Sequence, residues 1–417
     1  MSKRNEFVDV MRGVAILLVV LGHTMTGCTA NSESSFLYNV IWSIQMPLFF
    51  LISGYVTKYS KSIKTTSDLC NYIKRRTIAY MWPWLIWSFL VRGIILGQSY
   101  FLTVKFLFWH MDTGYWFLAS IWTISIAFGI SSFFAEKSND KSDSKYMIRM
   151  LIFYLLCMVA LLGIGLSTGL SFFAIKQTLY YMPFYFAGFL WGRYQDNIMS
   201  IKWGKSCISI LVALCLGVWL YIMVRYNIYA LPDSGMAIVF RAITSLCGCV
   251  ALCGLCKGIY KSSTAFGGGG TLVRSSFTRT LSQPLSVPES SHNGVRSCGK
   301  RALDFNDNDK LCDYGNFNST YSNNRYKKQY SSKDIVLYEV ISKMVHWAGK
   351  QSLEIYLIHG LVLAILKTRN AVIFPSALGY SLVFTNFLIT LASCYFVIDV
   401  ISCNEVLRKS LAIRPSI

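Results

Sequence analysis

Three ionisable side chains lie in an otherwise apolar segment near the start of the chain: Asp9, Arg12 and His23. Charged groups in a membrane helix are costly and usually face a cavity inside the protein. Arg12 and His23 are eleven residues apart, which is almost three helical turns. They therefore share one helix face, about 16 Å apart along its axis. Asp9 precedes Arg12 by one turn and can pair with it. A buried imidazole suits a general base, because its charge changes near neutral pH.

Each of these residues also has a purely structural interpretation, which the sequence leaves open. Asp9 and Arg12 could form a salt bridge at the membrane surface, and His23 could make a hydrogen bond between helices.

The composition indicates that membrane-spanning helices position these residues. Of the 417 residues, 54% are hydrophobic and only 14% are charged, and the mean hydropathy is +0.44. Soluble domains carry about 25% charged residues. These values exclude a soluble enzyme, a disordered protein and a nucleic-acid-binding protein, although 40 Lys+Arg against 20 Asp+Glu give a net charge of +20. In a membrane protein this excess belongs to the cytoplasmic loops.

A helix needs about 20 apolar residues to cross a bilayer, and ten segments meet this condition. We therefore predict an all-α, polytopic membrane bundle of about ten transmembrane helices. The predicted spans are residues 7–27, 36–56, 77–97, 115–135, 147–167, 171–191, 206–225, 236–256, 346–366 and 376–402.

The distribution of Lys and Arg predicts the orientation. Loops 57–76 and 136–149 are rich in basic residues, whereas loop 28–35 has none and loop 98–114 has Lys105 alone. Because cytoplasmic loops carry the excess of positive charge, we expect a multi-pass protein of the cytoplasmic membrane with both termini in the cytoplasm.

Residues 261–340 differ from the rest of the chain. They are polar and rich in Ser and Asn, with four consecutive glycines at 267–270, a composition typical of a flexible linker. We expect a basic cytoplasmic loop that separates spans 1–8 (residues 1–260) from spans 9–10 and the C-terminal tail (341–417). It could touch anionic lipid headgroups.

Six blocks of sequence match a known family in order and topology. The chain resembles the membrane acyltransferase 3 family everywhere except over residues 261–340. The blocks are Asp9 to His23, Met46 to Tyr55, Lys74 to Pro83, Tyr115 to Leu118, Met182 to Gly188 and Gly349 to His359.

This resemblance implies an integral membrane enzyme that moves an acyl group, often acetyl, from cytoplasmic acyl-CoA to a hydroxyl of a carbohydrate, such as an exopolysaccharide or a lipid-linked glycan. It implies that His23 is the catalytic residue, and we expect Asp9 or a neighbouring polar group to assist it. It also implies that Arg12, Arg75 and Arg76 bind acyl-CoA.

The chemistry of arginine agrees with that last role, because its guanidinium presents a forked set of donors to phosphate. Arg75 and Arg76 could instead be only the basic residues of a cytoplasmic loop. Acyl-CoA is the expected cosubstrate, and we expect no bound cofactor. No metal site is expected either, because the Cys247–Cys256 cluster lacks a neighbouring histidine.

The last matching block has a geometry of its own. Ser352, Tyr356 and His359 follow one another at i, i+4 and i+7, so they form one polar stripe on a helix. The stripe could be the wall of an acceptor pocket, which we favour, or a set of contacts between helices. Trp116 could stack on a sugar ring in the same pocket or anchor the chain at the membrane interface.

Two other classes of function remain open. A transporter or flippase of a glycolipid or metabolite also uses charged groups inside a helical bundle, but the sequence shows no internal repeat. A non-catalytic scaffold is the third alternative, against which the pair of histidines, His23 and His359, argues.

Overall fold

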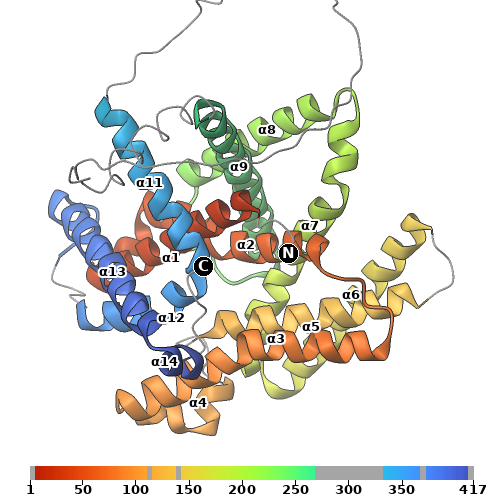
Figure 1. Ribbon diagram of the computed structural model, residues 1–417, viewed down its shortest axis with the longest axis horizontal. Coiled ribbons are helices and arrows are strands. Elements are labelled where there is room, and N and C mark those ends of the chain that lie inside the picture. The colour runs from red at the N-terminus through yellow and green to blue at the C-terminus, as the bar shows by residue number, and fades with distance from the viewer. Residues whose placement is uncertain (1–4, 110–114, 138–141, 268–331, 367–371, 412–417) are drawn as a thin grey trace, which may run out of the picture. The chain divides into compact units, whose positions relative to one another are not determined.

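The computed structural model describes residues 5–109, 115–137, 142–267, 332–366 and 372–411, and every regular element in these ranges is a helix (Figure 1). The described parts of Met1–Tyr260 and Val340–Ile417 form one compact unit, and the described residues between them, 261–267 and 332–339, belong to a second. The long helices are α1 (Glu6–Cys28), α2 (Phe36–Tyr55), α3 (Thr66–Leu85), α5 (Trp116–Glu136), α6 (Asp143–Thr168), α7 (Ile175–Ser200), α8 (Gly204–Arg225), α9 (Gly235–Gly267), α11 (Ser332–Lys350), α12 (Ser352–Leu366) and α13 (Ala377–Cys403). The short ones are η1 (Ser32–Ser34), η2 (Val56–Tyr59), η3 (Ile86–Ile95), η4 (Ser99–Leu102), α4 (Val104–Trp109), η6 (Phe172–Ala174) and α14 (Glu405–Ser410).

The predicted all-α polytopic membrane fold is confirmed. Each of the ten predicted spans contains helix. Among the residues that the structure describes, seven helices are long and apolar enough to cross a membrane: α1, α2 with η2, α5, α6, α8, the first part of α9, and α13. The other three spans correspond to α3 with its continuation η3, to α7, and to α11 with α12. For these three, membrane crossing stays a prediction.

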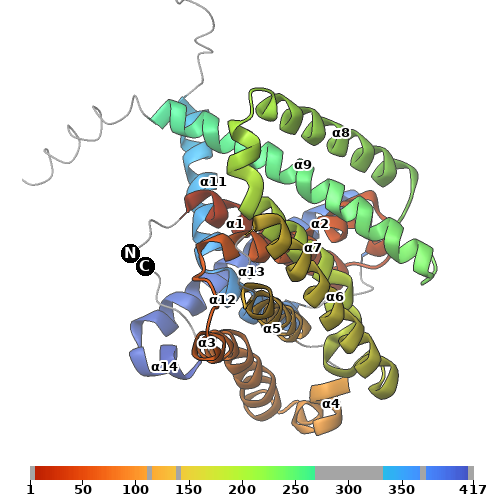
Figure 2. The same cartoon turned by 90° about the vertical axis from the view of Figure 1, so that its right-hand side faces the viewer.

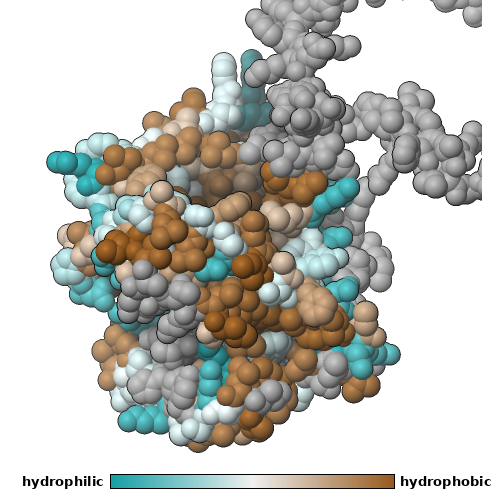
Figure 3. All heavy atoms as spheres, turned by 90° about the vertical axis from the view of Figure 1, so that its left-hand side faces the viewer, coloured by the Kyte–Doolittle hydropathy of each residue, from teal (hydrophilic) through white to brown (hydrophobic). Residues whose placement is uncertain are grey.

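Several of these helices present apolar side chains to the surroundings. Val159 on α6, Val224 on α8 and Phe396 on α13 are 65%, 76% and 67% exposed. Large brown areas of apolar residues cover the face shown in Figure 3. Exposed apolar surface on this scale marks a contact with membrane or protein, as the bilayer-facing sides of spanning helices require.

The most buried of the membrane-length helices are α1, α2 and α5. α1 and α2 lie near the middle of the helices in Figures 1 and 2. α1 packs against α2, α12 and α13, while α2 packs closely against α7. A Cβ atom added at Gly54 would lie 1.8 Å from the carbonyl oxygen of Tyr185, and one at Gly188 would lie 1.9 Å from that of Leu51. Glycines therefore let the backbones of α2 and α7 touch.

The predicted ninth span, 346–366, is two helices rather than one. α11 ends at Lys350 and α12 begins at Ser352. Near this break a Cβ atom at Gly349 would lie 1.8 Å from the carbonyl oxygen of Asp9, and one at Gly13 would lie 2.0 Å from that of Val345. The chain thus contacts α1 directly and then starts a new helix, so that α12 has only 15 residues.

The predicted loop 261–340 is shorter than expected at both ends. Residues 261–267 continue α9, and 332–340 belong to α11. The remainder of that predicted loop, 268–331, lies outside the described residues.

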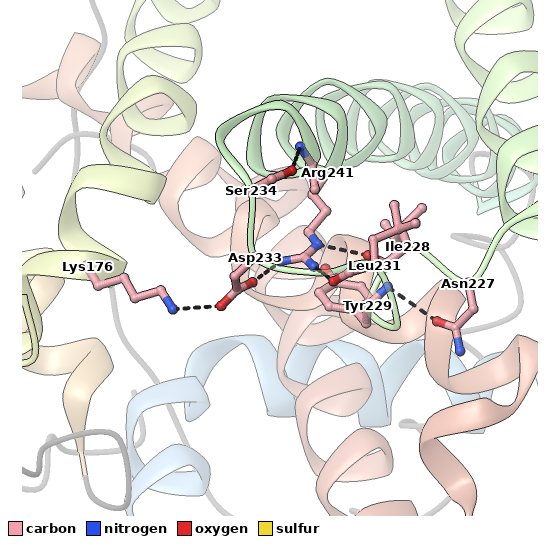
Figure 4. A network of polar contacts seen from close by, with 9 residues as sticks. Lys176, Asn227, Ile228, Tyr229, Leu231, Asp233, Ser234 and Arg241 are labelled. Atoms are coloured by element: carbon pink, nitrogen blue, oxygen red, sulfur yellow. Dashed lines mark hydrogen bonds and ion pairs between the residues drawn. The ribbon is translucent and has the colours of Figure 1, made fainter.

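The connection between α8 and α9 is held by a network of polar contacts (Figure 4). Arg241 Nη1 and Lys176 Nζ donate to the carboxylate of Asp233 at 2.8 Å and 3.1 Å. Arg241 also donates through Nε to the carbonyl oxygen of Ile228, at 2.8 Å, and to that of Leu231. The hydrogen bonds from Arg241 and Lys176 hold the pKa of the Asp233 carboxyl below its usual value. This network fixes a loop that contacts α2, as described below.

Candidate active site

A cavity of about 570 Å³ lies where α1 ends and α2 begins, and His23 lines it. The wall is completed by residues near the end of η3, at the start of α5 and along α12 from Tyr356 onward. Antiparallel helices bring these ends together, although the residues are far apart in the sequence. The volume is that of a typical small-molecule site.

Two histidines lie side by side in this cavity. The ring centroids of His23 and His359 are 5.4 Å apart, and the rings are tilted by 35°. His359 Nδ1 lies 3.0 Å from the carbonyl oxygen of Ile355, one turn earlier on α12. Because a carbonyl oxygen can only accept, Nδ1 carries the proton in the neutral ring, and Nε2 keeps its lone pair. The pair therefore provides a nitrogen that can accept a proton beside His23.

Aromatic side chains form much of the cavity wall. Tyr38, Trp42, Tyr115, Trp116 and Tyr356 all line it. One face of Trp116 is covered by Tyr181, whose ring stacks on it at 5.7 Å. Flat, rigid walls of this kind suit the ring of a sugar or another compact polar molecule.

Two charged side chains also line the cavity: Arg92 and Glu33. The Arg92 guanidinium lies 4.7 Å from the ring centre of Phe101 and 5.6 Å from that of Tyr115. Arg92 belongs to η3, a π-helical segment that continues α3 after Pro83. Proline removes a backbone donor from a helix, and π-helical segments frequently occur at functional sites.

Four of the predicted site residues line the cavity together: His23, Trp116, Tyr356 and His359. Ser352, from the same predicted stripe as Tyr356, is not among the lining residues. It begins α12, one turn before Tyr356.

The predicted acidic and basic residues lie elsewhere. α1 is one continuous helix from Glu6 to Cys28, so Asp9 lies about 21 Å from His23 along the axis. That distance exceeds the reach of a side chain, so Asp9 does not touch the imidazole, and the expectation that Asp9 or a neighbouring polar group assists His23 stays a prediction. Asp9 is 3% exposed and contributes instead to the packing of α1.

Arg12, Arg75 and Arg76 are not among the residues that line the cavity. Arg75 is exposed, and its Nε donates to the carbonyl oxygen of Asn71 at 3.3 Å. Arg76 is partly buried, with its guanidinium 5.0 Å from the ring centre of Tyr72. Their role in binding acyl-CoA stays a prediction.

The sequence-based reasoning missed several residues of the wall. Arg92 offered a usable signal, because a lone arginine in an apolar segment is a candidate functional residue by default. Trp42 and Gln45 offered none, since their types are unremarkable in such helices and only the packing of α1 on α2 brings them beside His23.

Comparison with known proteins relates this chain to acyltransferases. A family model described as an acyltransferase domain, that of the acyltransferase 3 family, matches residues 5–282. The nodulation protein NolL of Sinorhizobium fredii is 25% identical over 230 residues, which cover 50% of this chain and 58% of NolL. The chain therefore matches little more than half of that relative's length. No solved structure matches the chain.

Proposed function

Because this chain belongs to the acyltransferase 3 family, we propose that it transfers an acyl group from acyl-CoA to a hydroxyl of a carbohydrate acceptor. The acyl group is acetyl in this proposal, and the acceptor is an exopolysaccharide or a lipid-linked glycan. The observation that carries the proposal is the cavity in which His23 and His359 lie side by side among aromatic walls.

The reaction follows from the chemistry of the imidazole. His23 accepts the proton of the acceptor hydroxyl as the oxygen attacks the carbonyl carbon of the thioester. The tetrahedral intermediate then collapses: the C–S bond breaks, the ester remains on the acceptor, and CoA leaves as a thiolate that takes the proton from His23. A donor beside the carbonyl stabilises the intermediate's oxyanion, and the Arg92 guanidinium lines the same cavity.

The two substrates approach from opposite ends of the bundle in this proposal. Asn5 Nδ2 donates to Tyr59 Oη at 2.8 Å, so the start of α1 and the segment after α2 lie at one end. Ser62 donates to Glu136 at 2.9 Å, which brings the end of α5 to that end as well. The basic loop 57–76 lies at this same end, and in this proposal the phosphates of acyl-CoA bind there. The cavity lies at the other end, where the acceptor enters.

The test is acyl transfer by the purified full-length protein in lipid nanodiscs, with ¹⁴C-acetyl-CoA as donor. The acceptor is the cell-envelope glycan fraction of the organism that encodes the protein. We expect His23→Ala to lower turnover by about 100-fold or more, the contribution of a general base. The matched control is His346→Ala, since His346 lies on α11 and does not line the cavity.

Wild-type turnover by His23→Ala would remove His23 from the mechanism. If the wild-type protein formed no labelled ester but moved unmodified glycolipid between leaflets, the transporter hypothesis would replace this one.

A further inference from the structure

Two buried polar atoms on α2 have no hydrogen-bond partner among the described residues: Trp42 Nε1 and Gln45 Oε1. Gln45 is only 1% exposed. Most buried polar side-chain atoms in native proteins are hydrogen-bonded, and each exception calls for an explanation. Binding of a substrate would provide one here.

Both residues line the cavity that contains the histidines. They are three residues apart on α2 and therefore share a helix face. A Cβ atom built on Gly22 would lie 2.9 Å from Gln45 Oε1 and 3.5 Å from Trp42 Nε1, so one point next to Gly22 is close to both atoms. His23 follows Gly22 in the chain, and its ring centroid is 5.8 Å from that of Trp42. The two unpartnered atoms therefore lie near each other beside Gly22, and the Trp42 ring also lies beside the candidate base.

The α8–α9 connection holds Trp42 in position through a hydrogen bond to its backbone. Tyr229 donates its hydroxyl to the carbonyl oxygen of Trp42 at 2.7 Å, and the Tyr38 ring stacks on the indole at 5.1 Å. Arg241 binds the carbonyl oxygen of Ile228, next to Tyr229 (Figure 4). A donor held this rigidly can select a partner by geometry, because little freedom is lost on binding.

The chemistry of the two atoms limits what they can bind together. The indole nitrogen of Trp42 can only donate, and the carbonyl oxygen of Gln45 can only accept. An ammonium group could bind only to Gln45, and a carboxylate only to Trp42. A hydroxyl satisfies both, because its oxygen accepts from Trp42 while its own hydrogen is donated to Gln45.

We propose that Trp42 and Gln45 recognise a second hydroxyl of the acceptor, on the carbon next to the one that is acylated. The acceptor is then a pyranoside with a vicinal diol: one hydroxyl loses its proton to His23, and its neighbour is held between Trp42 Nε1 and Gln45 Oε1. The identification of the reacting hydroxyl rests on the proposed function. Recognition of the diol by Trp42 and Gln45 does not.

Binding can be measured without an acyl donor. Methyl β-glycosides of glucose, galactose and mannose, and their monodeoxy analogues, are titrated against the full-length protein in nanodiscs by saturation-transfer NMR. We expect the wild type to bind at least one parent glycoside and to lose affinity about tenfold when one ring hydroxyl is absent, the order expected for lost hydrogen bonds. Trp42→Phe and Gln45→Leu should each lower the affinity for the parent glycoside by a similar factor. Each variant should bind that deoxy analogue as tightly as it binds the parent glycoside.

Matched control variants are Trp122→Phe and Gln195→Leu, whose side chains bond Thr77 and Tyr55 away from the cavity. Both should keep the wild-type preference for the parent glycoside. The deoxy analogues probe the same contact in the unaltered protein, so the test does not depend on how well a variant folds.

The inference is overturned if the wild type binds none of the glycosides, or if Trp42→Phe and Gln45→Leu still discriminate against the deoxy analogue. The inference stands if both variants lose the preference for the parent glycoside over the deoxy analogue. If the wild type then transfers no acyl group, that absence of transfer counts against the proposed function alone.

Discussion

At the scale of single residues, His359 is the side chain whose removal tests the site most directly after His23. Its ring lies 5.4 Å from that of His23, and its Nδ1 is engaged by the Ile355 carbonyl. We expect His359→Phe, which keeps a ring of similar size, to lower kcat for acyl transfer about 100-fold, because proton transfer by a positioned imidazole contributes at least that much. The KM for acyl-CoA should change little, and steady-state kinetics at saturating acceptor measures both.

The companion variant His346→Phe alters a histidine on α11 that does not line the cavity, and it should keep wild-type kcat. If the His359→Phe protein kept the wild-type kcat, His359 would have a packing role only.

The sequence predicts some of the cavity's residues but not others, and the difference is physical. His23 and His359 are titratable groups in apolar helices. Because burying such a group costs free energy, its presence in the sequence predicts a functional role. Arg92 carries the same signal in the segment 86–95. An aromatic ring or an amide such as Trp42 or Gln45 carries no such signal, because its role depends on which helix faces it. That information lies in the packing of α1 on α2 rather than in local sequence.

At the scale of helices, the contact between α2 and α7 sets the shape of the site. α2 carries Trp42, and α7 carries Tyr181, whose ring stacks on Trp116. In Gly188→Ala the new methyl would lie 1.9 Å from the Leu51 carbonyl oxygen, so the helices must separate. We expect the free energy of unfolding to fall by about 1–3 kcal/mol, the usual cost of overpacking. Thermal unfolding in a single detergent measures this as a lower Tm.

Gly163→Ala on α6 is the comparison, because nothing lies within 4 Å of its added Cβ atom. Alanine is a better helix former than glycine by about 1 kcal/mol, so this variant should be as stable as the wild type or more so. Equal Tm values for Gly188→Ala and the wild type would contradict the close approach of the two backbones.

Helix type and location are predictable here from apolar runs, but helix breaks are not. The run 346–366 predicts one span, whereas α11 and α12 divide at Gln351. Gly349, which fits against the Asp9 carbonyl, lies just before the break. Hydropathy cannot anticipate it, because it depends on a tertiary contact that the run itself does not contain.

At the scale of the whole protein, the basic loop 57–76 and the cavity lie at opposite ends of α1 and α2. Lys64 lies 3.9 Å from Glu136 at the end of α5, at the same end as the contact between Asn5 and Tyr59. Glu33 lies in the connection between α1 and α2 and lines the cavity at the opposite end of these helices. Because positive charge is retained on the cytoplasmic side, we expect the cavity to face outward and the acceptor to be extracytoplasmic.

Cysteine labelling in intact cells tests this orientation. Ser34→Cys places a thiol at an exposed position of η1, beside Glu33, while the native Cys70 is exposed near the start of α3. Cys207 and Cys403, the other exposed cysteines among the described residues, are changed to Ser, and so are Cys298 and Cys312, which lie outside them. A membrane-impermeant maleimide should then label Ser34→Cys in intact cells and Cys70 only after permeabilisation. The reverse pattern would place the cavity in the cytoplasm. Acceptor and acyl-CoA would then reach His23 from the same side of the membrane.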